Sequence, residues 1–368
     1  MNIQKTWLHL LRRYKVRHII FAVAFILLCA YYLLRDLRPV ADFASRSIDK
    51  PWYGLSGSLF GAVPFSVAEW LCVLAALGVL VHLGIVVYGV IRKPEKLQRI
   101  YAALVALLAG ILAAYALLCW LWGIGFYSYT VPELSGIEDE APRVEALKEV
   151  TISFAEAANE AGEAVNRDEN GVFTCDVSSI LNEAPTLYDD LPAEFAFLEG
   201  PGIRPKPMAF SYLMSHMNFT GFFFPFTGEA NINTHAPDCF IPSTVAHELS
   251  HQRGVTREQD ANFIAVVVCM ESDEEDFVYS GALLAYIHLS NALRQASYED
   301  WEEADSYLGD AVRRDLRANN DYWAGFETPA AEASEAAYTE FLHNQGQELG
   351  MRSYGACVDM LVSYYRSG

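Results

Sequence analysis

Residues 247–251 read His-Glu-Leu-Ser-His, and this pentapeptide is the strongest local signal in the 368-residue chain. Residues four apart lie on one face of a helix, so His247 and His251 can bind one metal ion. Two neutral imidazoles suit zinc, and a catalytic zinc needs one further protein ligand and an open position. Glu248 follows the first histidine, where a carboxylate can take a proton from a metal-bound water. The competing interpretation is two surface histidines that happen to be four residues apart.

The flanking residues predict where the histidine helix begins and ends. Ser243 and Thr244 are good N-caps, so the helix can begin at either of them. It can end at Gly254, because glycine readily adopts the left-handed conformation that closes helices. A second helical pattern starts near Thr256. A tight turn between two helices is therefore expected directly after the histidines.

The third zinc ligand is expected in this second helix. Glu258 and Asn262 share one helical face there, whereas Asp260 points elsewhere. We expect the Glu258 carboxylate to fold back onto the metal, and Asn262 to hydrogen-bond a liganding imidazole and fix its tautomer. Asp260 is the reserve ligand. The competing interpretation of Glu258 is a first-turn glutamate that the helix dipole favours.

These motifs also resemble a known family. They resemble the domain-of-unknown-function 3810 family, which comprises bacterial membrane proteins with a zinc-peptidase signature of the HExxH type. The resemblance covers nearly the whole chain and implies a membrane-embedded N-terminal third. Asp260 departs from it, because a glutamate is expected there. The matching segments are residues 225–231, 247–254, 258–265, 279–281 and 353–355.

Three apolar runs precede the histidine motif. Residues 19–34, 70–91 and 100–126 contain no Asp, Glu, Lys or Arg, and the second and third are long enough to cross a bilayer. We therefore expect transmembrane helices at about 18–34, 67–91 and 100–126 in a membrane anchor formed by residues 1–130. Residues 131–368 then form the domain that holds the zinc site.

Basic residues predict the orientation of this anchor. The N-terminal arm and the turn at residues 92–99 are both rich in Lys and Arg, so both belong in the cytoplasm. The chain after the third span is then outside. Residues 1–130 have a net charge of +8 and residues 131–368 a net charge of −28. The acidic part argues against nucleic acid as a partner, because phosphates need a basic footprint.

Beyond the third span the chain is expected to be mainly α. Helical patterns cover residues 145–166, 177–183, 276–296, 301–319, 330–349 and 354–366. Residues 220–234 differ: an aromatic run and an alternating segment from Gly228 predict a β-hairpin, whose edge strand could pair with an extended peptide. The competing interpretation is ordinary core aromatics followed by a polar turn. The expected fold is three transmembrane helices followed by a helix-rich, zincin-like domain with a small hairpin or sheet.

Cysteines and tyrosines leave two questions open. Cys175, Cys239, Cys269 and Cys357 could form two disulfides, but no close spacing requires them, and Cys269 sits in an apolar run that favours a buried thiol. Tyrosines 279 and 354 are candidates for stabilising an oxyanion. Nothing in the sequence selects one of the chain's 20 tyrosines for this role.

The sequence therefore predicts a membrane-anchored, extracytoplasmic zinc metallopeptidase that cleaves peptide or protein substrates. His247, His251 and Glu258 would bind Zn²⁺, and Glu248 would be the general base for a metal-activated water. The alternative is a non-catalytic receptor or assembly protein with a structural zinc site, closed by Cys239 or His235 as a fourth ligand. An intramembrane protease is disfavoured, because polar residues flank the histidines.

Overall fold

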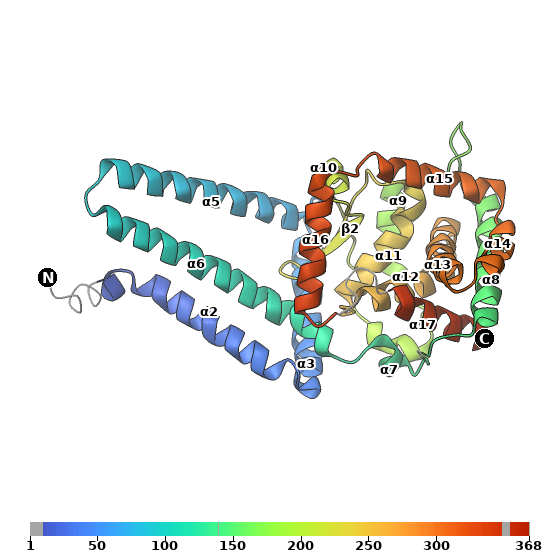
Figure 1. The fold of residues 1–368 in the computed structure, drawn as a ribbon, viewed down its shortest axis with the longest axis horizontal. Coiled ribbons are helices and arrows are strands. Elements are labelled where there is room, and N and C mark those ends of the chain that lie inside the picture. The colour runs from blue at the N-terminus through green and yellow to red at the C-terminus, as the bar shows by residue number, and fades with distance from the viewer. Residues whose placement is uncertain (1–9, 139, 348–353, 368) are drawn as a thin grey trace. The chain divides into compact units, whose positions relative to one another are not determined.

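The computed structural model describes residues 10–138, 140–347 and 354–367 (Figure 1). The chain folds into two compact units, one made of residues 1–49 and 68–128 and the other of residues 50–67 and 129–368. The mainly helical fold with three long apolar helices and a small sheet is confirmed. The anchor was expected to comprise residues 1–130, but residues 50–67 belong to the second unit.

The first unit contains three helices that are long and apolar enough to cross a membrane. Where α2 and α6 pack together, the buried residues are mostly alanines, and small side chains let two helices approach closely. The third helix ends earlier than predicted, because a 3-10 turn with two glycines follows it at Gly123–Tyr127. The helices of this unit are α2 (Lys15–Leu34), α3 (Arg38–Ala44), α5 (Val67–Arg92) and α6 (Lys96–Leu121), with a π-helical turn at Ser45–Asp49.

Residues 50–67 belong to the second unit because buried polar groups hold them there. The Lys206 ammonium group, which is 3% exposed, donates to backbone carbonyls of residues 60–63. The Ser66 hydroxyl donates to Asn231 Oδ1 at 2.6 Å. Buried polar groups need such partners, so this segment completes the second unit. The sequence of residues 50–67 gives little indication of this placement, because the hydrogen-bond partners of the segment lie more than 140 residues away.

The remaining helices of the second unit surround a buried pair, α12 and α13. Helix α13 packs along α8, and α11 packs on both members of the pair. The helices of this unit are α4 (Lys50–Gly61), α7 (Val131–Ser135), α8 (Val144–Ala164), α9 (Val177–Glu183), α10 (Ser211–His216), α11 (Ile241–Gln252), α12 (Glu258–Met270), α13 (Glu275–Ala296), α14 (Tyr298–Ser306), α15 (Asp310–Ala324), α16 (Pro329–Asn344) and α17 (Tyr354–Ser367), with 3-10 turns at Ala184–Thr186, Ala193–Leu198 and Asp238–Phe240.

One predicted helix is in fact two. Residues 301–319 were expected to be continuous, but the chain breaks between α14 and α15. Gly309 lies at the break, where its backbone N–H donates to Asn159 Oδ1 at 2.7 Å. This bond to a distant helix sets the position of the break. The other predicted helices are close to those observed, except that α16 ends at Asn344 and not at residue 349, because Gly346 has the left-handed conformation that closes a helix, with φ +80.

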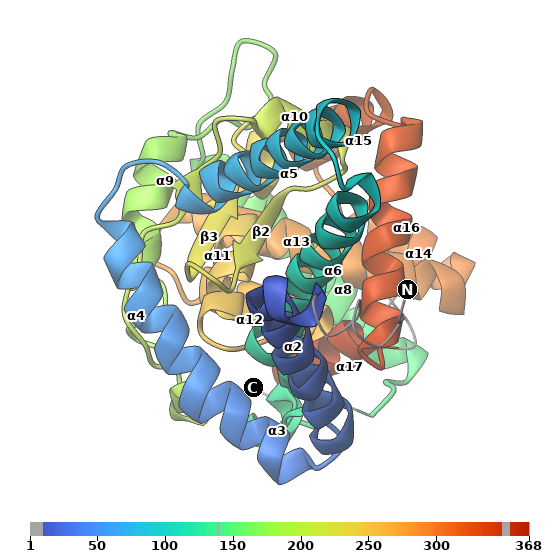
Figure 2. The ribbon, with the colours of Figure 1, turned by 90° about the vertical axis from the view of Figure 1, so that its left-hand side faces the viewer.

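The predicted hairpin is confirmed, and a short third strand joins it. Strand β2 (Gly221–Phe224) pairs antiparallel with β3 (Glu229–Ile232), and β1 (Lys206–Pro207) pairs parallel with the other side of β3. The order β1-β3-β2 makes β2 an edge strand, and the sheet packs against α11 (Figure 2). Gly228, at φ +65, closes the turn between β2 and β3. The edge strand thus lies beside the helix that holds the two histidines.

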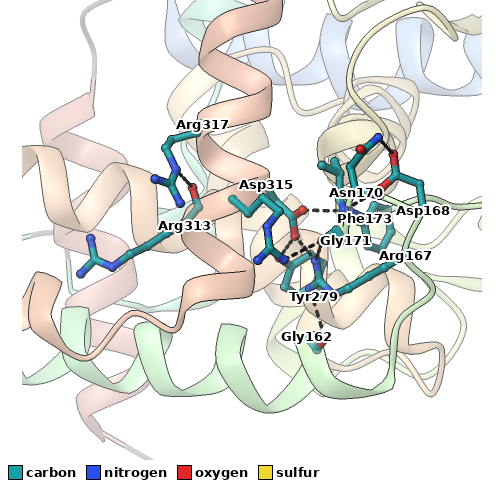
Figure 3. Close-up of polar contacts among 12 residues, drawn as sticks. Gly162, Arg167, Asp168, Asn170, Gly171, Phe173, Tyr279, Arg313, Asp315 and Arg317 are labelled. Atoms are coloured by element: carbon teal, nitrogen blue, oxygen red, sulfur yellow. Dashed lines mark hydrogen bonds and ion pairs between the residues drawn. The ribbon is translucent and has the colours of Figure 1, made fainter.

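A buried carboxylate joins three segments away from the histidines (Figure 3). Asp315 of α15 is 0% exposed and accepts hydrogen bonds from Arg167 Nη1 and the Phe173 backbone N–H, both at 2.8 Å. The Tyr279 hydroxyl of α13 also donates to it. Three donors offset the large cost of burying this charge. Tyr279, a candidate for stabilising an oxyanion, therefore has a structural role here.

Candidate metal centre

Helix α11 holds both histidines with the Nδ1 of each ring hydrogen-bonded to an oxygen and the Nε2 of each ring facing Glu258. His247 and His251 lie one turn apart, and their ring centroids are 4.7 Å apart. His251 Nδ1 donates to the Val255 carbonyl at 2.6 Å, and His247 Nδ1 donates to Asn262 Oδ1 at 2.9 Å. With Nδ1 as the hydrogen-bond donor in each ring, Nε2 is the atom through which each imidazole would bind zinc once its proton is displaced. Asn262 therefore lies where the sequence predicted it.

The start of α11 differs from the prediction, whereas its end agrees. The helix begins at Ile241, so Ser243 and Thr244 lie inside its first turn and are not N-caps. The Ser243 hydroxyl bonds back to the Phe240 carbonyl at 3.2 Å, and its backbone N–H donates to Ser280 of α13 at 3.0 Å. This bond to α13 lets the helix start earlier. At the other end, Gly254 has the predicted left-handed conformation, with φ +91.

The turn after α11 brings Glu258 to the histidines. Glu258 is the first residue of α12, and its Oε2 lies 3.2 Å from His247 Nε2. Its Oε1 lies 3.8 Å from His251 Nε2. One ligand atom from each of the three residues lies within 4.8 Å of the other two. No fourth His, Cys, Asp or Glu belongs to this group among the described residues.

These separations fit one metal ion. Two ligand atoms of a tetrahedral zinc lie roughly 3.3 Å apart, because each bond is about 2.0–2.2 Å long. The distances of 3.2 and 3.8 Å from Glu258 to the two imidazoles are near this value. Two imidazoles and one carboxylate form a donor set that suits zinc better than magnesium or calcium. The donor chemistry and its spacing therefore both fit Zn²⁺.

The other suggested ligands lie elsewhere. Asp260 is buried, and its Oδ2 accepts a hydrogen bond from the Val131 backbone N–H at 3.1 Å. It therefore holds the start of α7. His235 Nδ1 bonds to the Tyr322 hydroxyl at 2.8 Å. Cys239 belongs to the hydrophobic core, and among the described residues Cys175, Cys239, Cys269 and Cys357 form no disulfide. Asp260, His235 and Cys239 are all absent from the three-residue group.

Glu248 is a buried carboxylate beside this group. It is 4% exposed, and its Oε2 has no hydrogen-bond partner among the described residues. Burial raises its pKa to about 7, although the two histidines oppose that rise. Strand β2 lies directly against it: a Cβ on Gly221 would be 2.8 Å from Glu248 Oε1. An unpaired buried carboxylate is costly, which is characteristic of functional sites.

Tyr338 of α16 is part of the site, and the sequence did not indicate it. Its hydroxyl donates to Glu258 Oε1. Its ring stacks on Phe341, with centroids 6.4 Å apart, and meets the ring of Phe219 edge-on at 6.2 Å. The hydroxyl therefore orients the Glu258 carboxylate through Oε1, the oxygen that lies 3.8 Å from His251 Nε2. Of the earlier tyrosine candidates, Tyr279 binds Asp315, and the side chain of residue 354 lies outside the described residues.

The charges of the group favour a cation. Burial lowers the pKa of His251, but the adjacent Glu258 more than offsets this and raises it to about 9. Burial raises the pKa of Glu258, but the two histidines hold it well below its usual range. A proton therefore sits between these groups at neutral pH. A metal ion would displace that proton and take over the attraction of the Glu258 carboxylate.

Zinc affinity should consequently depend on pH. Below a His251 pKa of about 9, each zinc bound releases one proton, so affinity should rise by about tenfold per pH unit between pH 6.5 and 8.5. Competition with a chromophoric chelator of known pH dependence measures this slope. A His235→Gln variant should keep the slope, because His235 lies outside the group. An affinity that does not change with pH would contradict the assignment of His251 as a ligand.

The fold and this site define a mainly helical protein with three apolar helices and one group of two histidines and a glutamate. A family model described as "Protein of unknown function (DUF3810)" matches residues 45–362. The chain belongs to this family, as its motifs predicted. No curated protein matches the chain, and no solved structure matches it.

Proposed function

We propose that this protein is a membrane-anchored zinc metallopeptidase that hydrolyses peptide bonds. The observation that carries the proposal is the Glu248 carboxylate, which is buried without a partner for Oε2 beside a group of three metal-ligand donors. A structural zinc site is completed by four protein ligands and does not require an additional buried carboxylate without a partner. Three donors and an adjacent base support a catalytic site over the receptor or assembly alternative.

Each residue of the site has a separate role in the proposed hydrolysis. When bound, zinc would polarise a peptide carbonyl and lower the pKa of a water molecule. Glu248 accepts the proton of the attacking water and delivers it to the nitrogen of the leaving amine. Its pKa of about 7 suits both steps, because a proton carrier works best near the operating pH. Asn262 and Tyr338 hold His247 and Glu258 in position.

The edge strand supports a peptide as the substrate. The Asn233 backbone N–H donates to the Thr220 carbonyl at 2.9 Å, so these two residues form a hydrogen-bonded pair. In an antiparallel ladder such pairs alternate, and the backbone N–H and C=O of Gly221 therefore point away from β3. An extended peptide can pair with a strand edge of this kind. Pairing at Gly221 would place a substrate peptide bond close to Glu248.

The experiment that tests the proposal uses the full-length protein purified in detergent. The zinc-loaded protein is incubated with a peptide library of mixed sequence, and new termini are identified by mass spectrometry. We expect cleavage that stops when a chelator removes zinc and returns when zinc is added. Zinc binding with no cleavage of any peptide would contradict the proposal and favour the structural-zinc alternative.

We further propose that the second unit is extracytoplasmic. Residues 50–67 and 129–368 form one unit, so both segments lie on the same side of the membrane. Helices α5 and α6 connect them and together must cross the membrane an even number of times. The basic residues between these helices, at 92–99, favour the cytoplasm for their turn. The second unit then lies outside.

Reporter fusions test this topology. A phosphatase that is active only outside the cytoplasm should be active when fused after residue 140. The same reporter should be inactive when inserted in the turn between α5 and α6. The reverse pattern would place the zinc site in the cytoplasm.

A further inference from the structure

Helix α4 has apolar residues on two sides. Its inner side, with Tyr53, Ser56 and Gly57, is buried in the second unit. Its outer side consists of Trp52, Leu55 and Leu59, spaced three and four residues apart, which places them on one stripe. These side chains are 39%, 67% and 68% exposed. A helix that faces water normally has charged or polar residues on its outer side, and this one has none on the stripe.

The chain around α4 indicates what covers this stripe. Only residues 62–66 separate α4 from α5, and residues 35–49 separate it from α2. Both α2 and α5 are long and apolar enough to cross a membrane. Five residues reach at most about 18 Å, so α4 is confined to the neighbourhood of the bilayer surface. Tryptophan at the end of an apolar stripe is typical of the membrane interface.

We propose that the stripe formed by Trp52, Leu55 and Leu59 lies in the interfacial layer of the membrane that α2 and α5 cross. Helix α4 is then an interfacial helix: lipid covers its outer side and the second unit covers its inner side. Phe65, two residues before the start of α5, is another exposed apolar side chain in the short segment between α4 and α5, at 48% exposed. Lipid contact explains why exposed leucines occur on a helix of an otherwise acidic unit.

The inner side of α4 connects this contact to the metal centre. Trp52 belongs to the outer stripe, but its indole N–H reaches back to the second unit and donates to the Pro225 carbonyl at 3.0 Å, in the turn between β2 and β3. A Cβ on Gly57 would lie 2.8 Å from the Gly228 carbonyl oxygen, so α4 and this turn are in close contact. The same carbonyl accepts from Gln252 Nε2 at 2.7 Å. Gln252 follows His251 at the end of α11. Gly228 therefore contacts both α4 and the end of the helix that holds the two histidines.

A substrate class follows, and it rests on the proposed function. A site that α4 holds at the lipid surface acts on peptide segments close to that surface. The substrates are therefore the juxtamembrane segments of proteins or peptides that are themselves attached to the membrane. Figure 2 shows α4 along the side of the unit that carries β3 and α11.

Fluorescence quenching tests the lipid contact independently of any activity. Leu55→Cys or Leu59→Cys is introduced into the full-length protein with Cys29→Ser and Cys72→Ser, which remove the exposed cysteines. The labelled protein is placed in lipid nanodiscs and exposed to lipids with a doxyl quencher near the headgroup, or to aqueous iodide. We expect doxyl lipid to remove most of the fluorescence and iodide to leave it unchanged. A Glu302→Cys label on α14 should respond to iodide alone.

Two results would overturn the lipid contact. Quenching of the α4 labels by iodide alone, as at residue 302, would show that the stripe faces water. Protection from both quenchers that is lost on dilution would show that a second copy of the chain covers it.

A cleavage assay tests the substrate class. One peptide library is presented in liposomes with a lipid anchor and, separately, without an anchor. We expect a higher kcat/KM for the anchored library, and Leu55→Asp combined with Leu59→Asp should remove this preference while cleavage of the soluble library persists. Equal cleavage of both libraries by the parent protein would overturn the substrate class. Cleavage of neither would overturn the proposed function and with it the substrate class, and the quenching result would still decide the lipid contact.

Discussion

Replacing Glu248 by glutamine is expected to abolish peptide hydrolysis while the protein keeps its zinc. The amide preserves the shape of the side chain, but it cannot accept a proton from water and pass it to the leaving amine. Loss of a general base typically costs about 10²–10⁴-fold in rate. The three proposed zinc ligands are untouched, because Glu248 lies outside the three-residue group. Hydrolysis rate and zinc content, measured on the same purified sample, report the two properties separately.

Glu229→Gln is the matched control for this variant. Glu229 is an equally buried carboxylate on β3, and it accepts from the Val67 backbone N–H at 3.1 Å. The glutamine retains an oxygen for that bond and Glu229 lies outside the three-residue group, so zinc content and rate should stay close to those of the parent, although losing its negative charge near the buried Lys206 should lower thermal stability. If Glu248→Gln cleaves peptides as fast as the parent, the peptidase proposal fails and the structural-zinc alternative becomes the better one.

Removing the Glu258 carboxylate should have the largest effect on metal content. Glu258→Ala leaves two histidines, and a two-histidine site binds zinc poorly. Asp260→Ala should keep most of the zinc, because that carboxylate accepts a hydrogen bond from the Val131 backbone N–H. Loss of this hydrogen bond should lower the stability of the variant. Metal analysis of the purified variants, with a thermal unfolding curve for each, separates loss of metal from loss of fold.

Asn262→Ala should fall between these two variants. Its amide oxygen holds the His247 ring at 2.9 Å without touching the metal position. Loss of such a partner typically lowers metal affinity or activity by about 10- to 100-fold. Full zinc in Glu258→Ala together with zinc loss in Asp260→Ala would transfer the ligand role to Asp260.

The contacts of the metal group that could be predicted from the sequence are the local ones. Helical periodicity alone puts His247 and His251 on one face, and a glycine after the helix indicates a turn that returns Glu258 to them. Tyr338 could not be found in this way. It lies 80 residues after Glu258 in an alanine-rich helix, and only the packing of α16 brings its hydroxyl to the carboxylate.

The fold follows the same division. The long apolar helices and most helical segments of the second unit are properties of local sequence, and they agree with the structure within a few residues. The break between α14 and α15 depends on Asn159, and the place of residues 50–67 depends on Lys206 and Asn231. The local sequence of each segment does not indicate such partners, because these contacts form only when the distant segments are already folded.

The divided second unit has a consequence for how the protein is made. Residues 50–67 leave the ribosome first, but Ser66 cannot form its hydrogen bond until Asn231, which is 165 residues further along, has been synthesised. At about 5–20 residues per second, that interval is on the order of ten to thirty seconds. Under the proposed topology, α5 and α6 enter the membrane during this interval, before the partners of the inner side of α4 have been synthesised. Under the proposed membrane topology, assembly of the three-residue group is therefore coupled to membrane insertion, and we expect a chain arrested before α6 is inserted to leave the second unit incomplete.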